Sequence, residues 1–378
     1  MKSKRKTVLG IILLVLVISG VWLLKLYRQP LGPALELLTS TQLNPTLTTF
    51  PIEELAVEST ATETQPTATY TSTPQPLYGG PAVMNILAIG SDSRGQHYLY
   101  GLADIIRLVR VDFVKARVGI LEVPRDLWVD IPDISDHYNI TQGKLNQAYL
   151  YGNKGLGYYD GPGEGPGLLA RTLNLNFGAQ PDHYIAVNML TFEAIVDAIG
   201  GIDVYLPYEV SAKSASNPRA PSVPAGHHHF DGKTALWVAR IRQYSTFSRA
   251  ENQNIVMCAV RKKLLSPAIV PAIPKMVNDF RRYVQTDLSP EQINQLACLA
   301  TQMKGTNVVF ASFPINLFTA AKTFDPQLGT TTTTASADFN ILRDYIDRFQ
   351  QGTWPDPNLV INTTPSPAET DLEFSCGD

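Results

Sequence analysis

The chain has 378 residues, of which 44% are hydrophobic and 17% charged, and its formal net charge is −3. This length is enough for one large domain with a substantial core, or for two small ones. The near-neutral charge argues against the basic surface that nucleic-acid binding requires. The three cysteines, Cys258, Cys298 and Cys376, lack the close spacing of a zinc site or a redox motif.

The first 24 residues predict a membrane anchor. Four of the first six residues are Lys or Arg, and the 17 residues from Val8 to Leu24 carry no charge. About 17–25 apolar residues cross a bilayer, and the preceding cations orient the N-terminus toward the cytoplasm. A cleavable signal peptide is the alternative, but no small-residue cleavage site follows the apolar segment closely. We therefore expect a cytoplasmic tail over residues 1–7 and a transmembrane helix over residues 8–24.

Residues 25–78 predict a disordered stalk. From Gln29 to Pro76 there is no Lys or Arg, and Thr, Pro and Ser predominate. Such a segment cannot bury enough apolar surface to offset its ordering entropy, and proline keeps it extended.

A folded domain is predicted over residues 79–325. Strands are expected over Met84–Ile89, Ile105–Val111, Arg117–Val123, Leu127–Ile131, His183–Val187, Ile202–Leu206 and Asn307–Phe313. Helices are expected over Leu145–Tyr151, Leu168–Phe177, Phe192–Ile199, Gly232–Arg240, Arg249–Leu265, Ala272–Arg282 and Pro290–Met303. Strands that alternate with helices indicate an α/β sandwich.

Two further segments are predicted to be irregular. Glu209–Pro224 reads as a polar excursion between strand and helix. Residues 326–378 read as a loosely structured C-terminal extension, which includes a run of threonines at Gly329–Thr334 and a helix of unassigned attachment at Asp338–Phe349.

Charged residues gather where the first three strands begin or end. Asp92 follows the first strand, Asp104 precedes the second, and Pro124-Arg125-Asp126 follows the third. Since such strands are mostly buried, these charges should meet at one rim of the sheet. Carboxylates hold a hard cation there, while guanidinium groups neutralise phosphate oxygens, which indicates a metal–diphosphate site.

The motifs NILAIGSDSR, GLAD, EVPRDLWVDIP, KLNQAY and ALWVARIR, in this order and spacing, resemble the LytR-CpsA-Psr (LCP) family. Members are membrane-anchored phosphotransferases that move polyprenyl-diphosphate-linked glycans onto the bacterial cell wall. The resemblance covers residues 80–265 and extends more weakly to about residue 325. It implies an α-β-α sandwich with a mixed central sheet, preceded by one transmembrane helix, and a catalytic domain outside the cytoplasmic membrane.

The resemblance also assigns the metal ligands and the diphosphate contacts. Asp92 and Asp104 match the aspartates that hold Mg²⁺ (or Mn²⁺) at the diphosphate. Asp126 either orients Arg125 or acts as the base toward the acceptor hydroxyl. The expected substrate-binding residues are Arg94, Arg125, Arg240, Arg242, Arg249, Lys144 and Asn146, of which the last two support the edge of the site. Because a continuous helix would send Arg240 and Arg242 in different directions, we expect the chain to turn there.

Three positions depart from the family pattern. Leu102 stands where relatives have an arginine, and Thr246 and Asn252 replace an acid and a second arginine. The phosphate-binding region thereby lacks two positive charges and a partner acid, which predicts an altered substrate or a weaker activity.

Two other features of the sequence do not predict a functional site. His227, His228 and His229 would alternate between faces in an extended chain, so they do not converge on one ion, and they read as the entry to a helix. Cys258 and Cys298 lie in predicted helices, where they either pair outside the cytoplasm or remain buried thiols.

The leading hypothesis is an extracytoplasmic transferase with a polyprenyl-diphosphate glycan lipid and a cell-wall acceptor as its partners, and no nucleic acid. One alternative is a polyprenyl-diphosphate hydrolase, in which water replaces the acceptor. Another is a non-catalytic envelope-binding or regulatory protein, the role in which such sequences were described as transcriptional attenuators. Phosphoryl transfer depends on positioning and charge neutralisation, so the absence of a Ser-His-Asp pattern is consistent with the leading hypothesis.

Overall fold

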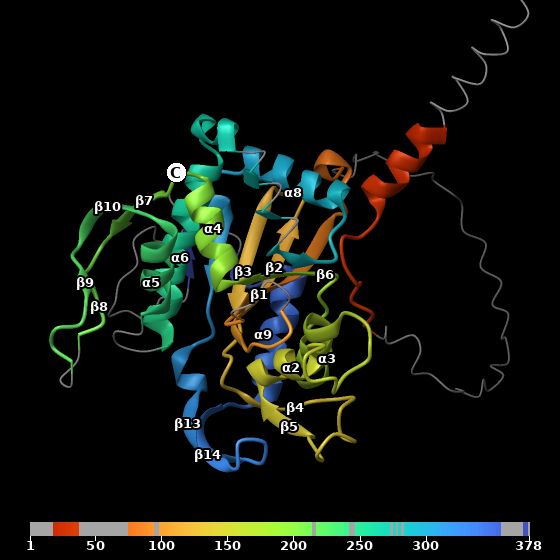
Figure 1. Cartoon of the computed structure of the whole chain (residues 1–378), viewed down its shortest axis with the longest axis vertical. Helices are drawn as coiled ribbons and strands as arrows, with labels where there is room; N and C mark the ends of the chain where they lie inside the picture. The colour runs from red at the N-terminus through yellow and green to blue at the C-terminus, as the bar shows by residue number, and fades with distance from the viewer. Residues whose placement is uncertain are drawn as a thin grey trace, which may run out of the picture.

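The computed structural model describes residues 18–37, 75–93, 98–213, 217–241, 246–272, 275–276, 279–280, 283–356 and 373–376. Its centre is a seven-stranded sheet with the strand order β11-β6-β1-β2-β3-β12-β15 (Figure 1). The strands are β1 (Val83–Ser91), β2 (Ala103–Asp112), β3 (Arg117–Glu122), β6 (His183–Asn188), β11 (Gln285–Thr286), β12 (Val308–Ala311) and β15 (Glu373–Ser375). The β6–β1 and β12–β3 pairs are parallel and the other pairs antiparallel. The expected mixed α/β fold with a central mixed sheet is confirmed.

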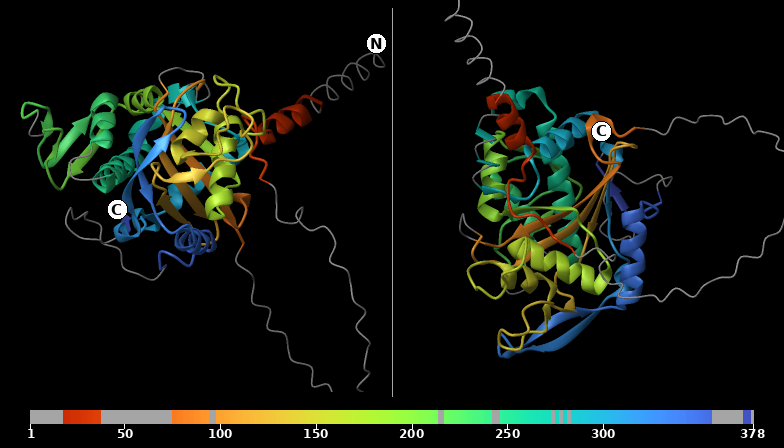
Figure 2. Two further views of the ribbon diagram at one scale, coloured as in Figure 1. Left: turned by 90° about the horizontal axis from the view of Figure 1, so that it is seen from below. Right: turned by 90° about the vertical axis from the view of Figure 1, so that its right-hand side faces the viewer.

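Helices cover both faces of this sheet because β1 is apolar on both sides. Leu87 and Ile89 belong to a core cluster with α2 (Leu145–Gly152), α3 (Glu164–Phe177) and α9 (Phe339–Gln351). Met84 and Ile86 pack on the other side, in a cluster that includes residues of α8 (Pro290–Gln302). Figure 2 shows the resulting three layers, which agree with the predicted α-β-α sandwich.

A second core cluster lies beside the main sheet (Figure 1). Its elements are α4 (Met189–Ala198), β7 (Ile202–Leu206), β10 (Gly226–Phe230), α5 (Gly232–Arg240), α6 (Thr246–Leu264) and the 3₁₀ helix η3 (Pro267–Ala272). The predicted polar excursion contains the small pair β8 (Val210–Ser211) and β9 (Ser222–Val223). The predicted helix over Ala272–Arg282 lies mostly outside the described residues.

The three consecutive histidines form strand β10 rather than the entry to a helix, which begins only at Gly232. They pair with β7 and take different partners. His229 Nδ1 lies 2.7 Å from Asp203 Oδ1, and this hydrogen bond lowers the pKa of the Asp203 carboxyl. His228 Nε2 lies 2.8 Å from the carbonyl oxygen of Pro224.

The described part of the C-terminal region is ordered, which corrects the prediction of a loose extension. β13 (Thr319–Asp325) and β14 (Thr330–Ser336) form an antiparallel hairpin, and β-branched threonines suit a pleated strand. Leu342, Ile346 and Phe349 form the buried stripe of α9 and join the main core cluster. The predicted helix at Asp338–Phe349 is therefore attached to the sheet.

Part of the predicted stalk lies against the domain. Leu31 N–H donates to the carbonyl oxygen of Leu288 (3.2 Å), and Leu35 N–H donates to the buried Asp287 Oδ2 (3.3 Å). Leu35 and Leu37 pack against the main core cluster. Residues 31–37 dock on the domain because their leucines gain free energy when they are buried. The rest of the predicted stalk is rich in polar residues and proline and has few such side chains.

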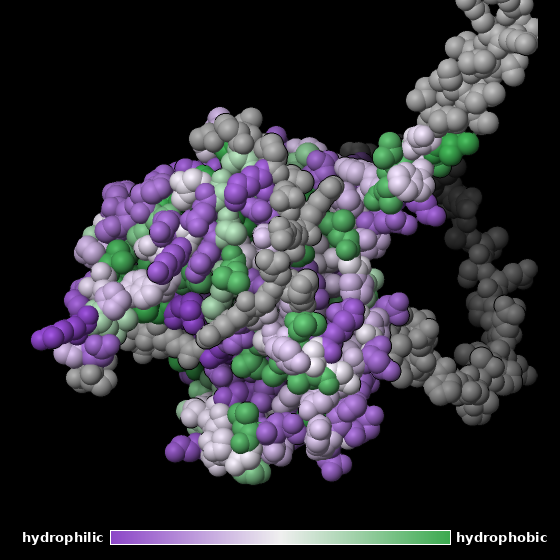
Figure 3. Space-filling view, in the orientation of Figure 1, coloured by the Kyte–Doolittle hydropathy of each residue, from purple (hydrophilic) through white to green (hydrophobic). Residues whose placement is uncertain are grey.

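Residues 18–28 form a helix whose Ile18, Val21, Trp22, Leu23 and Leu24 are 58–63% exposed, and green apolar atoms mark this helix in Figure 3. Among the described residues, no helix has both the length and the apolar character that a membrane span needs. Residues 8–17 of the predicted span, and residues 38–74 of the predicted stalk, lie outside the described residues.

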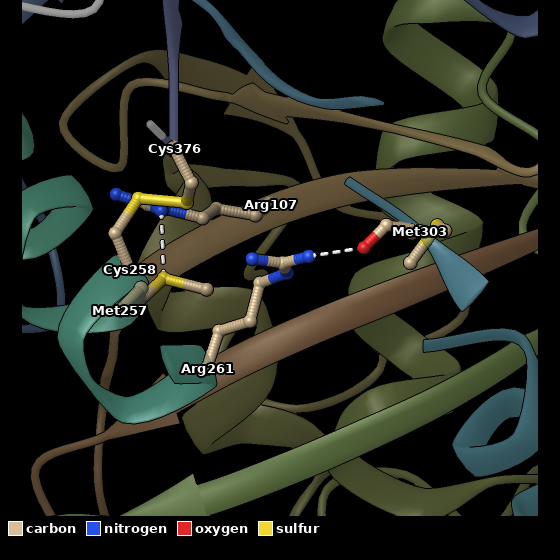
Figure 4. The surroundings of a disulfide bond; sticks show 6 residues. All are labelled: Arg107, Met257, Cys258, Arg261, Met303 and Cys376. Carbon is tan, nitrogen blue, oxygen red and sulfur yellow. Dashed lines mark hydrogen bonds between the residues drawn. A yellow bond between two sulfur atoms is a disulfide. The ribbon is translucent and has the colours of Figure 1, made fainter. Parts of the chain in front are cut away.

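The single disulfide among the described residues joins Cys258 of α6 to Cys376, which follows β15 (Figure 4). The expected alternatives, a Cys258–Cys298 bond or free thiols at both positions, are therefore wrong for Cys258. Pairing of β15 with β12 brings the C-terminal cysteine to α6 across 118 residues of sequence, a contact that sequence spacing does not reveal. Cys298 keeps a free, half-buried thiol.

Candidate active site

Asp92, Asp104 and Arg125 lie at the ends of the three adjacent strands β1, β2 and β3. Asp92 directly follows β1, and Arg125 lies in the loop after β3. In the β1–β2 register Gly90 pairs with Ile105 and Ser91 with Ala103, so Asp104 is the extra residue of a β-bulge. A bulge redirects a side chain and interrupts the ladder, which explains how an acid is presented at the start of an apolar strand.

Four charged side chains form what we call the acid–cation cluster: Asp104, Arg125, Asp126 and Lys144. Arg125 Nη1 forms an ion pair with Asp104 Oδ1, and Arg125 Nε lies 3.5 Å from Asp126 Oδ2. Lys144 Nζ lies 3.8 Å from Asp126 Oδ1. The four side chains are 15–30% exposed, so they are held by one another but remain open to a ligand.

Asp92 is oriented by the backbone of Leu102. Its Oδ1 accepts the Leu102 N–H at 2.6 Å, and its own N–H donates to the Leu102 carbonyl oxygen at 3.1 Å. Gly101 permits this turn: its φ is +140°, and a Cβ there would lie 2.7 Å from the Ser93 nitrogen. No protein hydrogen bond to Asp92 Oδ2 is present among the described residues.

The two aspartates suit a divalent ion that takes few protein ligands. The described residues contain no group of three or more His, Cys, Asp or Glu side chains that could hold a metal. Mg²⁺ needs only one or two carboxylates, because waters and substrate phosphates complete its coordination. Asp92, with an available Oδ2, and Asp104, on the neighbouring strand, therefore fit Mg²⁺ or Mn²⁺ in donor type.

The loop that carries Arg125 and Asp126 is held from two sides. From α2, Asn146 N–H donates to the Arg125 carbonyl oxygen (3.1 Å) and Leu145 N–H donates to that of Leu127 (2.8 Å). From β14, Ala335 N–H donates to the Asp126 carbonyl oxygen (2.9 Å). Backbone hydrogen bonds of this kind fix the position from which the two side chains extend.

A buried pair connects α2 to the hairpin that contributes Ala335. Gln147 Nε2 donates to Asp325 Oδ2 (2.7 Å), and Gln147 Oε1 accepts the Lys144 N–H (2.6 Å). Asp325 is only 1% exposed, and its Oδ1 caps the hairpin turn by accepting N–H groups of Gln327 and Leu328. Sequence reasoning missed this support, since the two residues lie 178 positions apart.

The remaining predicted arginines differ in position. Arg249, in α6, is 5% exposed. Gln253, one helical turn later and on the same face, accepts a hydrogen bond from Arg107 of β2 (3.0 Å), so this face of α6 is turned toward the sheet.

Arg240 is exposed at the last position of α5 and forms no ion pair with the described residues. The chain turns at Ile241 (φ −67°, ψ 134°), as expected. Arg94 and Arg242 lie outside the described residues.

Asn252 is the position at which the family resemblance implies an arginine, and here its side chain is 1% exposed and occupied by local contacts. Its Oδ1 accepts the Tyr208 hydroxyl (3.3 Å) and its Nδ2 donates to the Ile241 carbonyl oxygen (3.5 Å). Glu251 Oε2, at 3.1 Å, is a second acceptor within reach of the one proton of this hydroxyl, and burial raises the pKa of the Glu251 carboxyl. Asn252 therefore links α6 to Tyr208 and to Ile241, the residue after α5, without supplying a charge.

Arg107 is a buried cation that sequence reasoning missed. It is 3% exposed, forms an ion pair with Glu122 (3.1 Å), and donates to Met257 Sδ (3.0 Å) as well as to Gln253. Its guanidinium also lies over the Phe310 ring, 5.7 Å from the centroid. Figure 4 shows the hydrogen bond from Arg107 to Met257, next to the disulfide. A charge inside the apolar run Ile105–Val111 was the available signal.

We expect Arg107→Met to lower the free energy of unfolding by about 3–5 kcal/mol, because it leaves Glu122 uncompensated and breaks the sheet–α6 contact. Urea unfolding measures this change. Lys213→Met is the matched control: its ion pair with Glu209 is half exposed on both sides, so we expect its urea midpoint to match that of the wild type. Equal midpoints for the two variants would contradict a bridging role for Arg107.

The fold and the acid–cation cluster define the class: a mixed α/β sandwich with carboxylates and cations at one end of its central strands. The model of the LytR_cpsA_psr family matches residues 53–341, and the chain belongs to this family.

Two curated relatives illustrate the similarity. The chain is 30% identical over 216 residues to Regulatory protein MsrR of Staphylococcus aureus (strain COL), which is 56% of this chain and 58% of that protein. It is 28% identical over 223 residues to the polyisoprenyl-teichoic acid–peptidoglycan teichoic acid transferase TagU of Oceanobacillus iheyensis, 58% of this chain and 63% of that protein. The matched region thus spans less than two thirds of the length of these relatives.

Solved structures share the fold. The crystal structure of TagV from B. subtilis matches with a TM-score of 0.53 and 20% identity, over 71% of this chain and 97% of that one. Protein gbs0355 from Streptococcus agalactiae matches with a TM-score of 0.55 and 20% identity, over 71% of this chain and 87% of that one. At this identity the likeness establishes the architecture alone.

Proposed function

We propose that the protein is a membrane-anchored, extracytoplasmic phosphotransferase that attaches a polyprenyl-diphosphate-linked glycan to a cell-envelope acceptor. The observation that carries the proposal is the acid–cation cluster beside Asp92, in a chain that belongs to the LytR_cpsA_psr family. The relative that is named a teichoic acid transferase supports the same class of reaction.

In this proposal Asp92 and the four residues of the acid–cation cluster each have a separate role in binding a diphosphate. Asp92 and Asp104 hold Mg²⁺ or Mn²⁺, which when bound neutralises negative charge on the diphosphate oxygens. Arg125 exchanges its contact with Asp104 for phosphate oxygens, which its planar fork can bind in pairs. Lys144 adds a second positive charge. Asp126 contacts both cations, which favours a positioning role for it over that of a base.

The transfer step then forms one bond and breaks another at the same phosphorus. The oxygen of the acceptor hydroxyl attacks the sugar-linked phosphorus, and the bond from that phosphorus to the bridging oxygen breaks. The lipid phosphate leaves with the electron pair, and the hydroxyl proton passes to a base. The positive charges of Arg125 and Lys144 stabilise the negative charge that develops on the phosphoryl oxygens and on the leaving group.

Three observations support a location outside the cytoplasm and beside the membrane. Disulfides such as Cys258–Cys376 persist in oxidising compartments. The uncharged segment Val8–Leu24 is long enough for a span, and the described part of it exposes its apolar side chains. Docking of residues 31–37 on the domain keeps the domain close to that anchor, where a lipid-linked substrate is found.

The test is a transfer assay with a polyprenyl-diphosphate glycan and a cell-wall glycan acceptor. We expect turnover to require Mg²⁺ or Mn²⁺ and to fall about 10²–10³-fold in Asp92→Asn and in Asp104→Asn. Asp136→Asn, at a carboxyl that is 81% exposed, is the matched control and should leave turnover unchanged. Undiminished turnover in the two aspartate variants would contradict the proposed metal site.

A non-catalytic regulatory role is the second candidate, and a specific observation favours it. Asn252 and Leu102 replace family arginines, Asn252 is engaged in local contacts, and one relative is named a regulatory protein. Tight binding of the lipid diphosphate that is insensitive to Mg²⁺ and yields no product would support this role. Release of lipid phosphate without any acceptor would instead indicate a hydrolase.

A further inference from the structure

A small two-stranded ribbon continues the candidate active site along the surface of the domain. Its strands are β4 (Trp128–Asp130) and β5 (Gln142–Lys144). They run antiparallel, with Trp128 opposite Lys144 and Asp130 opposite Gln142. Opposite residues of such a pair point to the same side, and so do residues two apart in one strand. The four side chains therefore form one row, which we call the ribbon face, and this row begins at Lys144 of the acid–cation cluster.

The other side of the ribbon is packed on the domain. Val129 is 1% exposed and belongs to the main core cluster, and at Gly143 a Cβ would lie 2.8 Å from Gln147 Oε1 of α2. From α3, the buried Asn176 donates through Nδ2 to the Asp130 carbonyl oxygen (2.8 Å) and accepts the Asp130 N–H at Oδ1 (3.1 Å). Because the backbone of the ribbon is held in this way, a ligand on the ribbon face binds with little ordering of the protein.

Two consecutive hydrogen bonds orient the indole ring of Trp128. Its Nε1 donates to Gln142 Oε1 (3.2 Å), and Gln142 Nε2 donates to Asp130 Oδ1 (2.7 Å). Because an indole N–H can only donate and an ionised carboxylate can only accept, these two neighbours fix the amide of Gln142 in one orientation. Trp128 is half-buried, whereas Asp130 and Gln142 are exposed. The ribbon face thus combines an oriented aromatic ring with exposed polar groups beside it.

The polar groups of the ribbon face can bind a ligand. Gln142 Nε2 carries two hydrogens, of which Asp130 Oδ1 accepts one, and Asp130 Oδ2 accepts no hydrogen bond from the described residues. A sugar ring is complementary to this arrangement, because the C–H groups on its faces pack on an indole and the hydroxyls at its edge both donate and accept. The carboxylate of Asp130 favours a neutral sugar over an anionic one.

The ribbon face lies at the end of the domain that is remote from the helix of residues 18–28. That helix lies beside α8, where Arg28 pairs with Glu291 (3.1 Å). Figure 1 shows the helix, in red, at the top and β4 and β5 at the bottom, and the right-hand view of Figure 2 agrees. In the proposed function the lipid-linked donor comes from the membrane and the cell-envelope acceptor lies beyond it. The position of the ribbon face therefore suits the acceptor.

We propose that the ribbon face binds a neutral sugar unit of the acceptor glycan, with the sugar ring on Trp128 and its hydroxyls on Gln142 and Asp130. This inference rests on the proposed transferase function and gives a binding surface to its second substrate. Trp128 and Lys144 are opposite each other, which places their Cβ atoms about 4.5–5.5 Å apart. A sugar on Trp128 therefore lies next to a cation that holds the diphosphate, and a neighbouring hydroxyl of the same glycan can reach the phosphorus.

The first test measures the KM of the acceptor and the KM of the donor separately, in the transfer assay with soluble cell-wall glycan strands as the acceptor. We expect Trp128→Ala to raise the acceptor KM about tenfold and Gln142→Ala about threefold, through loss of an aromatic contact and of a hydrogen bond. The donor KM and kcat should stay unchanged. Trp128→Phe keeps a ring and should recover most of the affinity. Tyr205→Ala is the matched control, since Tyr205 is a 56% exposed aromatic residue on the other ribbon, β7–β10.

The second test needs no transfer activity. The full chain in detergent is sedimented with purified cell walls in the absence of donor, and each variant is checked by its thermal unfolding. We expect Trp128→Ala to be retained less than the wild type and Tyr205→Ala to be retained equally. Equal retention of the folded Trp128→Ala variant and the wild type would overturn the inference, and so would a rise in the donor KM alone, which would assign the ribbon face to the donor sugar. If the wild type transfers no glycan, the proposed function fails, while sedimentation still decides whether the ribbon face binds the wall.

Discussion

Arg125→Ala is expected to reduce glycan transfer about 10²–10³-fold while the thermal unfolding temperature stays close to that of the wild type. Loss of one positioned donor to a transition-state oxyanion costs this much, and Arg125 is the cation that contacts both acids of the cluster. The effect on folding should be small because Asp104 and Asp126 are 28% and 30% exposed, so water can solvate them when the arginine is gone.

Arg125→Lys refines this expectation. Lysine keeps the charge but lacks the planar fork that binds two phosphate oxygens, so its activity should lie between those of Arg125→Ala and the wild type. Arg219→Ala is the matched control, since Arg219 is exposed and distant in sequence from every site residue. Full transfer by Arg125→Ala, or an equal loss in Arg219→Ala, would contradict the role that we give to Arg125.

Cys258→Ala combined with Cys376→Ala is expected to lower the free energy of unfolding by about 4–5 kcal/mol. The bond closes a loop of 118 residues, and in the chain-entropy model a 100-residue loop is worth about 4.7 kcal/mol. The bond also links the edge strand β15 to α6. Two arginines connect α6 to the rest of the domain: Arg107 of β2 donates to Met257 of α6, and Arg261 Nη2 of α6 donates to the Met303 carbonyl oxygen (2.5 Å; Figure 4).

Guanidinium unfolding of the oxidised protein, the reduced protein and the double variant measures this loss. Reduction should destabilise the wild type to the level of the double variant and have no further effect on that variant. Cys298→Ala, which removes the free thiol, should leave the midpoint unchanged. Equal midpoints for the oxidised wild type and the double variant would show that the bond contributes nothing to stability.

The sequence was sufficient to predict the central sheet and the place of its charged ends. Short β-branched runs such as Ile105–Val111, set between turn signals, indicate strands, and a charge at the end of a buried strand must lie at a rim. Asp104 and Arg125 are in contact as expected, although only the structure shows that Asp104 occupies a bulge.

Features that depend on contacts between distant segments were not predictable. The partner of Cys258, the docking of Leu35 on Asp287 and the pairing of Gln147 with Asp325 each join segments more than a hundred residues apart. For Leu35 and Cys376 the local composition pointed elsewhere, because Thr-rich and Pro-rich segments resemble disordered chain until a neighbouring surface is known. The β14 support of the Asp126 loop was missed for this reason.

Binding of a polyprenyl diphosphate with and without Mg²⁺ tests the central claim most directly. If Asp92, Asp104 and Arg125 form one metal–diphosphate site, chelation of Mg²⁺ should weaken binding by the wild type, and Asp92→Asn should bind weakly in both conditions. Affinity that is the same with and without Mg²⁺, and the same in the wild type and Asp92→Asn, would contradict it.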